Sequence, residues 1–434
     1  MAEATTHATD SPPAKKSGRI HYIDGVRAFA ALAVVVLHIL QMRGLRLETA
    51  GVIPGFDYSG ALTNGAFSDI LRILISLFLN FGTLAVKVFI VISGYTIMIS
   101  VVKSKDGMPK GGIKGYLQRR IKRIWPPYYA ALTISILIIL LVPGMNELWF
   151  NRYHDIALPL SLESVVSHAL FIHTWFPQYA QTINTPMWSI AVEEQIYILF
   201  PLVLLPFWRN RNSLFMLLSA AVVGFVPMLF LPLETYHSTR AWFLVLFALG
   251  ATGVSINFSD RPQEIKLREK VPWAPLGIGL LGIWFVATKI APKLLGIDDG
   301  HALMRLEAFT DILFGGAWMA FFIHLTEVWK RGIPKRSFLA VFNSRPAVSL
   351  GLFSYSIYLM HVPILSVLTM VLMRLGVDGE LLYVILFVVG FPLAIGLTYL
   401  FHVVFERPFM PQAAKQLPTA ASGFQPANQS ATGD

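Results

Sequence analysis

Two ionisable side chains in the first long apolar run of the sequence could do chemistry inside a membrane. Arg27 and His38 lie eleven residues apart, and residues 29–37 between them carry no polar side chain. Eleven residues of an α-helix return to within about 20° of the starting direction and rise about 16 Å, so both side chains share one face. Ionisable groups inside a membrane span are costly and often mark function, although a lone histidine can also be a packing residue. Asp24 can pair with Arg27 on the same helix, and that pair could serve only as an anchor.

A second apolar run opens with two carboxylates, Glu193 and Glu194, followed by Gln195 and Tyr197. The helix dipole favours an acidic side chain in the first turn, which accounts for one of the two carboxylates. It accounts less well for the whole polar group, so these residues are candidates for a site.

A third polar group lies near the C-terminus. Ser354, Tyr358 and His361 stand at positions 0, 4 and 7, a spacing that places them on one face of a helix. Hydrogen bonding between neighbouring helices is the structural alternative for these side chains.

A basic cluster contains Arg119, Arg120, Lys122 and Arg123, directly before another apolar run. Basic residues at the end of a span often report only its topology. Arginine also binds phosphate through paired hydrogen bonds, so this cluster has the chemistry to hold a polyanion at the membrane surface.

The composition places these groups in a membrane protein. Of 434 residues, 55% are hydrophobic and 14% are charged, whereas a soluble domain carries about 25% charged residues. The absence of cysteine excludes a thiolate nucleophile and thiolate metal ligands, and we expect neither a metal site nor a bound cofactor. The net charge of +10 fits positive loops and contact with an acidic lipid bilayer. We expect no nucleic-acid partner, because no basic segment is interleaved with aromatic residues on a soluble domain.

Ten segments are long and apolar enough to cross the hydrocarbon core as helices. The sequence predicts an all-α, polytopic integral membrane helical bundle of about ten transmembrane helices, at 24–42, 83–102, 127–143, 188–207, 213–232, 239–256, 273–291, 308–328, 347–372 and 382–405. The apolar segments 66–81 and 158–175 are too short or too interrupted, and we expect them to be interfacial or re-entrant, with a further span as the alternative for either. We expect one membrane domain over 21–408, between disordered cytoplasmic tails at 1–20 and 409–434.

The distribution of lysine and arginine predicts the orientation. The loops assigned to the cytoplasm hold 24 of them and the loops assigned to the outside hold 7, with the other 4 of 35 inside spans. This bias predicts a multi-pass protein of the plasma (inner) membrane with both termini in the cytoplasm. On this map Arg27, Arg120 and Arg123 lie at the cytoplasmic end, whereas His38 and Glu193 lie nearer the outer end. The pattern suits a polyanionic ligand that is held from inside and reaches toward the imidazole.

The motifs follow one another in the order found in a known family. Over about residues 20–410 the chain resembles the membrane acyltransferases of acyltransferase family 3, which acylate surface polysaccharides, nodulation factors and some antibiotics. The resemblance rests on six motifs, namely Ile23–Ala28 with His38, Phe89–Tyr95, Arg120–Pro126, Trp188–Tyr197, Phe353–His361 and Phe405–Pro408. The chain departs from the family pattern at Ile190 and Ala191, where Leu-Ser is usual, and at Met360, where tryptophan is common.

The resemblance implies an O-acyltransferase that moves an acyl group, usually acetyl, from acyl-CoA to a hydroxyl of a carbohydrate or lipid-linked glycan. His38 would be the general base or a transiently acylated nucleophile. Glu193 would be the second catalytic residue and would orient or protonate a reacting group. The arginines would bind the phosphates of the donor, and Tyr358 or Ser354 would donate to the oxyanion of the intermediate. The residues expected to contact substrates are Asp24, Arg27, Arg120, Arg123, Glu194, Tyr197, Ser354, Tyr358 and His361.

The alternative from another class is a proton-coupled transporter of a small molecule or glycan precursor, with His38 and Glu193 as a proton relay. A non-catalytic membrane partner of an export machine is a weaker alternative. It predicts that replacing His38 leaves the phenotype unchanged.

Overall fold

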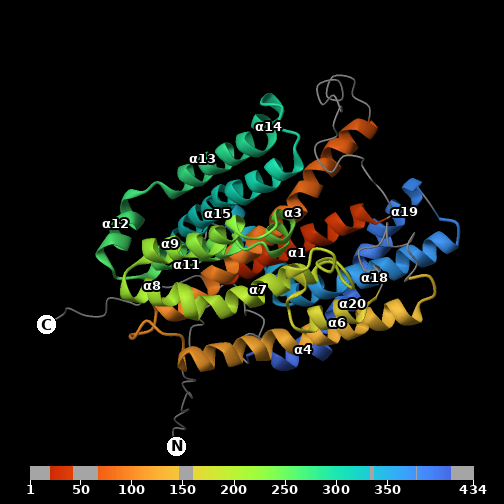
Figure 1. Cartoon of the computed structure of the whole chain (residues 1–434), viewed down its shortest axis with the longest axis horizontal. Helices are drawn as coiled ribbons and strands as arrows, with labels where there is room; N and C mark the ends of the chain where they lie inside the picture. Colours follow the sequence, from red (N-terminus) through yellow and green to blue (C-terminus); the bar gives the residue numbers. More distant parts are fainter. Residues whose placement is uncertain (1–19, 43–66, 146–159, 333–336, 378, 412–434) are drawn as a thin grey trace, which may run out of the picture.

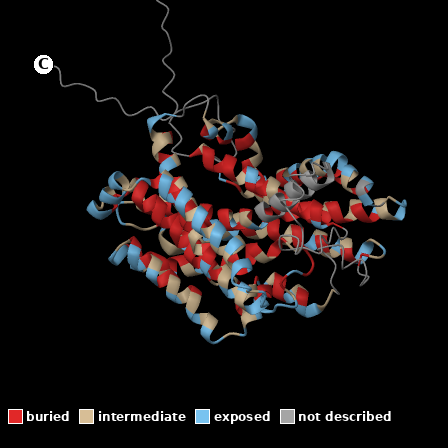
Figure 2. Ribbon diagram, turned by 90° about the horizontal axis from the view of Figure 1, so that it is seen from above, coloured by how far each residue is buried: buried red, intermediate tan, exposed pale blue. Residues whose placement is uncertain are grey.

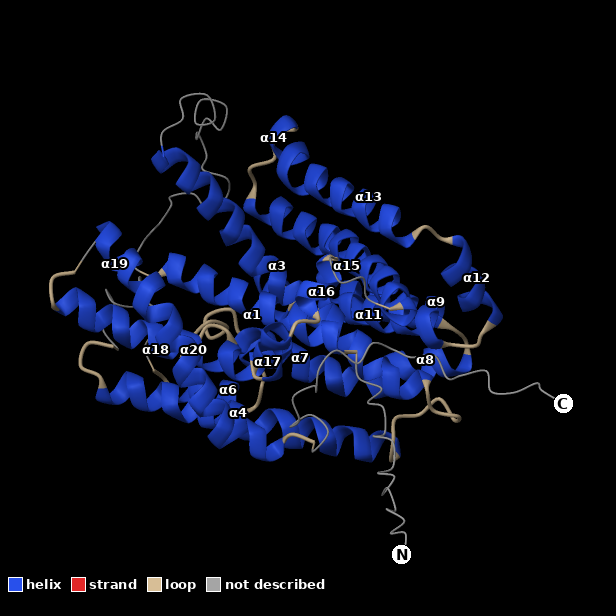
Figure 3. Ribbon diagram, turned by 180° about the vertical axis from the view of Figure 1, so that it is seen from behind, coloured by secondary structure: helices blue, strands red, loops and turns tan. Residues whose placement is uncertain are grey.

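The computed structural model describes residues 20–42, 67–145, 160–332, 337–377 and 379–411. These ranges are built from helices and turns and contain no strand, which confirms the predicted all-α class (Figure 3). Apart from residues 20 and 409–411, the two segments predicted as tails, 1–20 and 409–434, lie outside the described residues.

The helices and helical turns are α1 (His21–Gln41), α3 (Phe67–Val102), α4 (Gly112–Leu141), α6 (Leu162–Ala169), η1 (His173–Trp175), α7 (Met187–Leu199), η2 (Phe200–Leu204), α8 (Leu205–Asn210), α9 (Ser213–Phe225), η3 (Val226–Leu229), α10 (Leu233–Thr239), α11 (Phe243–Phe258), α12 (Pro262–Lys270), α13 (Trp273–Phe285), η4 (Val286–Ile290), α14 (Ala291–Leu294), α15 (Gly300–Arg331), α16 (Phe338–Phe342), α17 (Arg345–Leu352), α18 (Ser354–Arg374), α19 (Gly379–Ile385), η5 (Leu386–Gly390), α20 (Phe391–Phe401), η6 (His402–Glu406) and η7 (Arg407–Phe409).

Nine continuous helical stretches of the described chain are long and apolar enough to span a membrane. Each contains or overlaps one of the predicted spans. The remaining predicted span, 213–232, coincides with the shorter apolar stretch Ser213–Leu229. The chain is therefore the polytopic helical bundle that its apolar runs predict.

Two segments differ from the prediction. Residues 67–81 do not form a separate interfacial piece, because α3 runs without a break from Phe67 to Val102. The predicted span 347–372 contains two helices, because the chain leaves the helical conformation at Phe353, where α17 ends and α18 begins. Hydropathy alone missed this break, since Phe353 is as apolar as its neighbours.

The core of the bundle forms where α1, α3 and α11 meet. α1 packs against α3, α17 and α18, while α3 and α11 share the most extensive interface (Figure 1). A Cβ atom added at Gly94 would lie 1.9 Å from the carbonyl oxygen of Phe247, and one added at Gly250 would lie 1.9 Å from that of Val91. The two backbones are therefore in direct contact, as small residues allow between membrane helices.

Burial falls from the centre of the bundle to its edge. In the apolar window of Leu233–Phe258, 89% of the residues are buried, against 6% in Trp273–Leu294. α13 and α14 lie at the edge of the molecule (Figure 1). Buried residues gather in the central helices (Figure 2). The motif-bearing helices α1, α3, α7 and α18 belong to the packed centre. α4, which carries the basic cluster, lies at the edge, with 39% of its apolar window buried (Figure 1). On α4, Arg120 and Arg123 are half-buried, whereas Lys122 is exposed.

Candidate active site

Two cavities lie along α1, one toward each of its ends. The first has a volume of about 540 Å³ and is lined by arginines of α1 and α4, and we call it the arginine cavity. The second has a volume of about 610 Å³ and is lined by His38, and we call it the histidine cavity. The arginine cavity collects eight of the predicted site residues, namely Asp24, Arg27, Arg120, Arg123, Glu193, Tyr197, Ser354 and Tyr358.

The basic side of the arginine cavity comes from α1 and α4. A guanidinium nitrogen of Arg27, Nη2, donates to the hydroxyl of Thr96 on α3 over 3.2 Å. Arg120 and Arg123 are three residues apart and face the same way on α4, and the guanidinium of Arg120 lies over the ring of Tyr197 at 5.6 Å. Three arginines around one cavity have the chemistry to hold an anion with several phosphate groups.

The other polar side chains of this cavity come from α3, α7 and α18. The hydroxyls of Ser93 and Tyr197 both donate to Oε1 of Glu193. Nearby, the hydroxyls of Ser189 and Tyr358 are 2.6 Å apart. The carboxylate is therefore held in place by two donors, and the hydroxyl pair supplies further hydrogen-bonding groups on the cavity wall.

Glu194 and His361 do not line either cavity, although the sequence pattern groups them with residues that do. The carboxylate of Glu194 is buried against α4 and accepts from Nε1 of Trp125 over 2.8 Å. Adjacent residues of a helix diverge by about 100°, so Glu193 and Glu194 face different neighbours. His361 is fully buried behind His38.

The histidine pair links α1 to α18. Nδ1 of His38 lies 2.9 Å from the carbonyl oxygen of Val34 and 3.1 Å from Nε2 of His361. Nδ1 of His361 lies 2.7 Å from the carbonyl oxygen of Ile357. A carbonyl only accepts, so each Nδ1 carries a proton, and Nε2 of a neutral His361 is then an acceptor for the Nδ1–H group of His38.

This hydrogen-bond pattern assigns the tautomer of His38. With its proton on Nδ1, the neutral imidazole has a lone pair on Nε2, which is the nitrogen a general base or nucleophile needs. His361 accepts a hydrogen bond from His38 and so fixes the orientation and the tautomer of the His38 ring. A buried acceptor on the far nitrogen plays the same part in the Ser-His-Asp triad.

Val86 and Tyr358 are the described residues that line both cavities. The ring of Tyr358 packs against Phe89 and His361, with centroids 6.0 and 6.2 Å away. The sequence map placed His38 and Glu193 at a similar depth, but they line different cavities. Val86 and Tyr358 therefore form part of the boundary between the cavity that His38 lines and the cavity that the arginines line.

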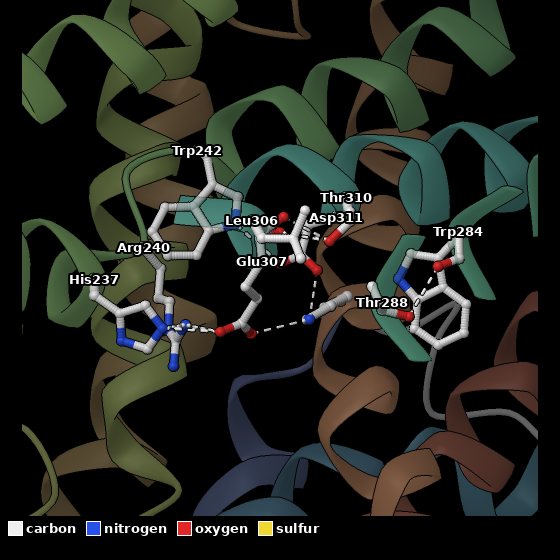
Figure 4. A network of polar contacts seen from close by, with 10 residues as sticks. His237, Arg240, Trp242, Trp284, Thr288, Leu306, Glu307, Thr310 and Asp311 are labelled. Carbon is white, nitrogen blue, oxygen red and sulfur yellow. Dashed lines mark hydrogen bonds and ion pairs between the residues drawn. The ribbon is translucent and has the colours of Figure 1, made fainter. Parts of the chain in front are cut away.

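The histidine cavity has a polar cluster that the sequence reasoning missed. Lys87 of α3 donates to Asp311 over 2.5 Å and to Glu307 over 3.1 Å, both on α15. Glu307 also contacts His237, in the last turn of α10, and Arg240, which caps the end of that helix (Figure 4). A signal was present, because Lys87 and Asp311 are isolated charges within the predicted spans 83–102 and 308–328, and the cost that singled out Arg27 applies to them equally.

A second histidine pair lies outside the membrane-spanning helices, in α6 and η1. The rings of His168 and His173 stack with centroids 3.8 Å apart, and both are fully buried. Burial lowers the pKa of His168 to about 4 and lowers that of His173 well below its ordinary value. The pair is thus neutral at physiological pH and serves packing.

Comparisons with known proteins agree on one family. The family model described as an acyltransferase domain, acyltransferase family 3, matches residues 20–403. "O-acetyltransferase OatA" of Staphylococcus aureus (strain NCTC 8325 / PS 47) is 26% identical over 331 residues, which cover 72% of this chain and 50% of that protein. "Putative O-acetyltransferase SACOL0978" of Staphylococcus aureus (strain COL) is 23% identical over 430 residues, which cover 93% and 59%. The chain spans about half the length of the curated relatives it matches, and no solved structure matches it significantly.

Proposed function

The chain belongs to this acyltransferase family, and from that premise we propose that it transfers an acetyl group from acetyl-CoA to a hydroxyl of a cell-surface or exported glycan. The observation that carries the proposal is the pair of cavities along α1. One is lined by three arginines, the other by an imidazole in the tautomer of a base, and Tyr358 lines both.

The arginine cavity is the proposed donor site. CoA carries its phosphates at one end and its reactive thioester at the other. Arg27, Arg120 and Arg123 would hold the phosphates through charge-assisted hydrogen bonds. The uncharged part of the donor would then extend along the cavity toward Tyr358. We propose that this cavity opens toward the cytoplasm, as the loop charges predict, and that acyl-CoA enters from that side.

The histidine cavity is the proposed acceptor site. Nε2 of His38 takes the proton of the acceptor hydroxyl as the oxygen attacks the thioester carbonyl. The hydroxyl of Tyr358, at the wall between the cavities, would donate to the oxyanion of the tetrahedral intermediate. Collapse of the intermediate breaks the carbon–sulfur bond and expels the CoA thiolate, which receives the proton from His38. The products are the glycan ester and CoA.

We propose for Glu193 a positioning role in the donor site, whereas its motif suggests a second catalytic residue. Its carboxylate accepts from Ser93 and Tyr197 inside the arginine cavity. We propose that Glu193, by accepting both hydroxyl protons, holds Ser93 and Tyr197 in position on the wall of the donor site. An acylated His38 is the competing mechanism, and it predicts that the protein itself becomes labelled when acetyl-CoA is supplied without an acceptor.

The test is acetyl transfer from radiolabelled acetyl-CoA by the purified full chain in lipid nanodiscs, with cell-surface glycans as acceptor. Replacing His38 with alanine should lower turnover by about 10²–10⁴, the usual loss of a general base. His324→Ala is the matched control, because His324 is exposed on α15 and lines neither cavity. Full activity in His38→Ala would refute the proposal. Because nanodiscs sustain no ion gradient, transfer there would also decide against the transporter.

A further inference from the structure

We propose that the histidine cavity binds a single uncharged sugar ring of the acceptor, and that the polar cluster around Glu307 selects against sugars carrying a carboxylate or phosphate. The Glu307 cluster consists of Lys87, His237, Arg240, Glu307 and Asp311. The inference rests on the proposed function, since it names the chemical class of the acceptor for that reaction.

Lys87, His237, Arg240 and Glu307 all line the cavity, and Glu307 is the most exposed of the four. Its side chain is 35% exposed, whereas that of Asp311 behind it is 1% exposed. One carboxylate oxygen of Glu307 accepts from Lys87, and the other lies 2.8 Å from Nε2 of His237 and 3.3 Å from Nη1 of Arg240 (Figure 4). A carboxylate held from three sides has its orientation fixed before a ligand arrives. It can still accept from a hydroxyl, because it has about four lone-pair positions.

Arg240 is held as firmly as Glu307. Its guanidinium lies between two indole rings, 5.5 Å from the centroid of Trp188 and 5.3 Å from that of Trp242. Its backbone ends α10 in the left-handed region with φ of 50°, which is uncommon for a non-glycine residue. The two indoles therefore hold the guanidinium of Arg240 so that its N–H donors face the cavity. Trp188 itself lines the cavity.

A sugar ring fits this combination better than other hydroxyl compounds. Adjacent ring hydroxyls match planar groups that bind in pairs, such as a carboxylate and a guanidinium. Tryptophan offers a large apolar surface with a polar edge for the C–H face of the ring. The side chains of Gln178, Gln181 and Thr185 also line the cavity and add neutral donors and acceptors.

The charges of the cluster argue for an uncharged ring. Lys87 and Arg240 are balanced by Asp311 and Glu307, and Glu234 adds a further carboxylate to the lining. No cation of the cluster lacks a nearby carboxylate. An acidic sugar would bring a charge out of water and place it beside Glu307, where like charges repel, so binding would be penalised. Specificity arises here from what the cavity disfavours as much as from what it contacts.

The experiment uses two probes that differ only at carbon 6, methyl β-glucoside and methyl β-glucuronide. Initial rates of transfer from radiolabelled acetyl-CoA are measured with the purified full chain in nanodiscs. We expect kcat/KM for the glucoside to exceed that for the glucuronide by at least about tenfold. Glu307→Gln should lower kcat/KM for the glucoside by about 10- to 100-fold, the value of one charge-assisted hydrogen bond, and should narrow the difference between the probes. KM for acetyl-CoA should not change.

Two further variants guard against a folding defect. Gln181→Ala removes a side chain at the exposed rim of the cavity and should raise KM for the glucoside alone. Glu327→Gln makes the same substitution as Glu307→Gln on the same helix, but Glu327 lines neither cavity and should leave both probes unaffected.

The outcomes separate the two proposals. Equal use of the probes, or preference for the glucuronide, overturns the inference about charge. Consumption of acetyl-CoA that depends on His38, with transfer to neither probe, overturns the sugar site and leaves the proposed reaction standing. If acetyl-CoA is not consumed in a His38-dependent manner with any acceptor, the proposed function fails and this inference falls with it.

Discussion

Replacing His361 with phenylalanine should slow acyl transfer without weakening donor binding. The structure makes His361 an acceptor for the Nδ1–H group of His38, at 3.1 Å, and places it outside both cavities. Phenylalanine keeps a ring of similar size in this fully buried position but cannot accept a hydrogen bond. Glutamine can place its amide oxygen close to the position of Nε2 and should restore part of the rate.

The size of the effect follows from two hydrogen bonds. Nδ1–H of His38 also donates to the carbonyl oxygen of Val34, at 2.9 Å, so the tautomer survives the substitution. What is lost is stabilisation of the imidazolium that forms when His38 takes the proton. A hydrogen bond to a charged group contributes about 1.5–3 kcal/mol, which corresponds to a loss of about 10- to 150-fold in kcat.

The assay is kcat and KM for acetyl-CoA under saturating acceptor, alongside the melting temperature of the protein in detergent. We expect kcat to fall by that factor in His361→Phe, to recover in part in His361→Gln, and KM for acetyl-CoA to stay unchanged in both. A phenylalanine variant that folds and turns over at the wild-type rate would refute the positioning role. If glutamine and phenylalanine lost activity equally, the acceptor argument would also fail.

Three other predictions follow from the geometry. Arg123→Ala should raise KM for acetyl-CoA by about tenfold or more with a smaller change in kcat, because the contact is remote from the reacting bond. Lys122→Ala, on the exposed face of α4, should leave KM unchanged. Equal effects of the two substitutions would mean that the basic cluster serves only the topology of the protein. Gly250→Ala should destabilise the protein by about 1–3 kcal/mol or more, because its Cβ would lie 1.9 Å from a backbone oxygen of α3, while Gly396→Ala, with open space around it, should lie near wild type in thermal unfolding. Because the pKa of His168 is lowered to about 4 in the fold, the unfolded chain binds the extra proton first and stability should fall by about 3 kcal/mol between pH 6.5 and 4; a melting temperature as pH-dependent in His168→Gln as in wild type would contradict this.

The sequence predicted which residues share a helix face but not which helices meet. The sequence predicted that Arg27, Arg120 and Arg123 lie at one end of their spans, and all three line the arginine cavity. It predicted Glu193 nearer the other end, yet Glu193 lines the same cavity. The contact between His38 and His361 joins residues 323 positions apart. Contacts of this kind arise from packing between helices, and no pattern within a single run specifies them.

Two errors of the sequence reasoning have a common cause. Glu193 and Glu194 were treated as one group, and 66–81 was separated from the span that follows it. Both interpretations followed residue type along the sequence rather than helical geometry: the two glutamates were grouped because both are acidic, and 66–81 was set apart because its apolar run is short and interrupted. A step of one residue turns a side chain by about 100°, and a helix continues through a polar residue as readily as through an apolar one when both are good helix formers.

In the proposed function the two cavities open to opposite sides of the membrane, so the electric field of the membrane would be concentrated at Tyr358 and Val86, which line both cavities. When water reaches a thin wall from both sides, the transmembrane voltage falls mainly across that wall, and one elementary charge carried through 100 mV changes the free energy by about 2.3 kcal/mol. In the proposed reaction an acyl group leaves a thiolate on one side and a proton returns to that thiolate from the other. Transfer of the acyl group away from the thiolate is equivalent to one positive charge crossing in one direction, and the returning proton is one positive charge crossing in the other. Turnover would therefore be electroneutral. If the proton were instead released on the acceptor side, each acetylation would be electrogenic. The membrane potential would then change the rate of acetylation.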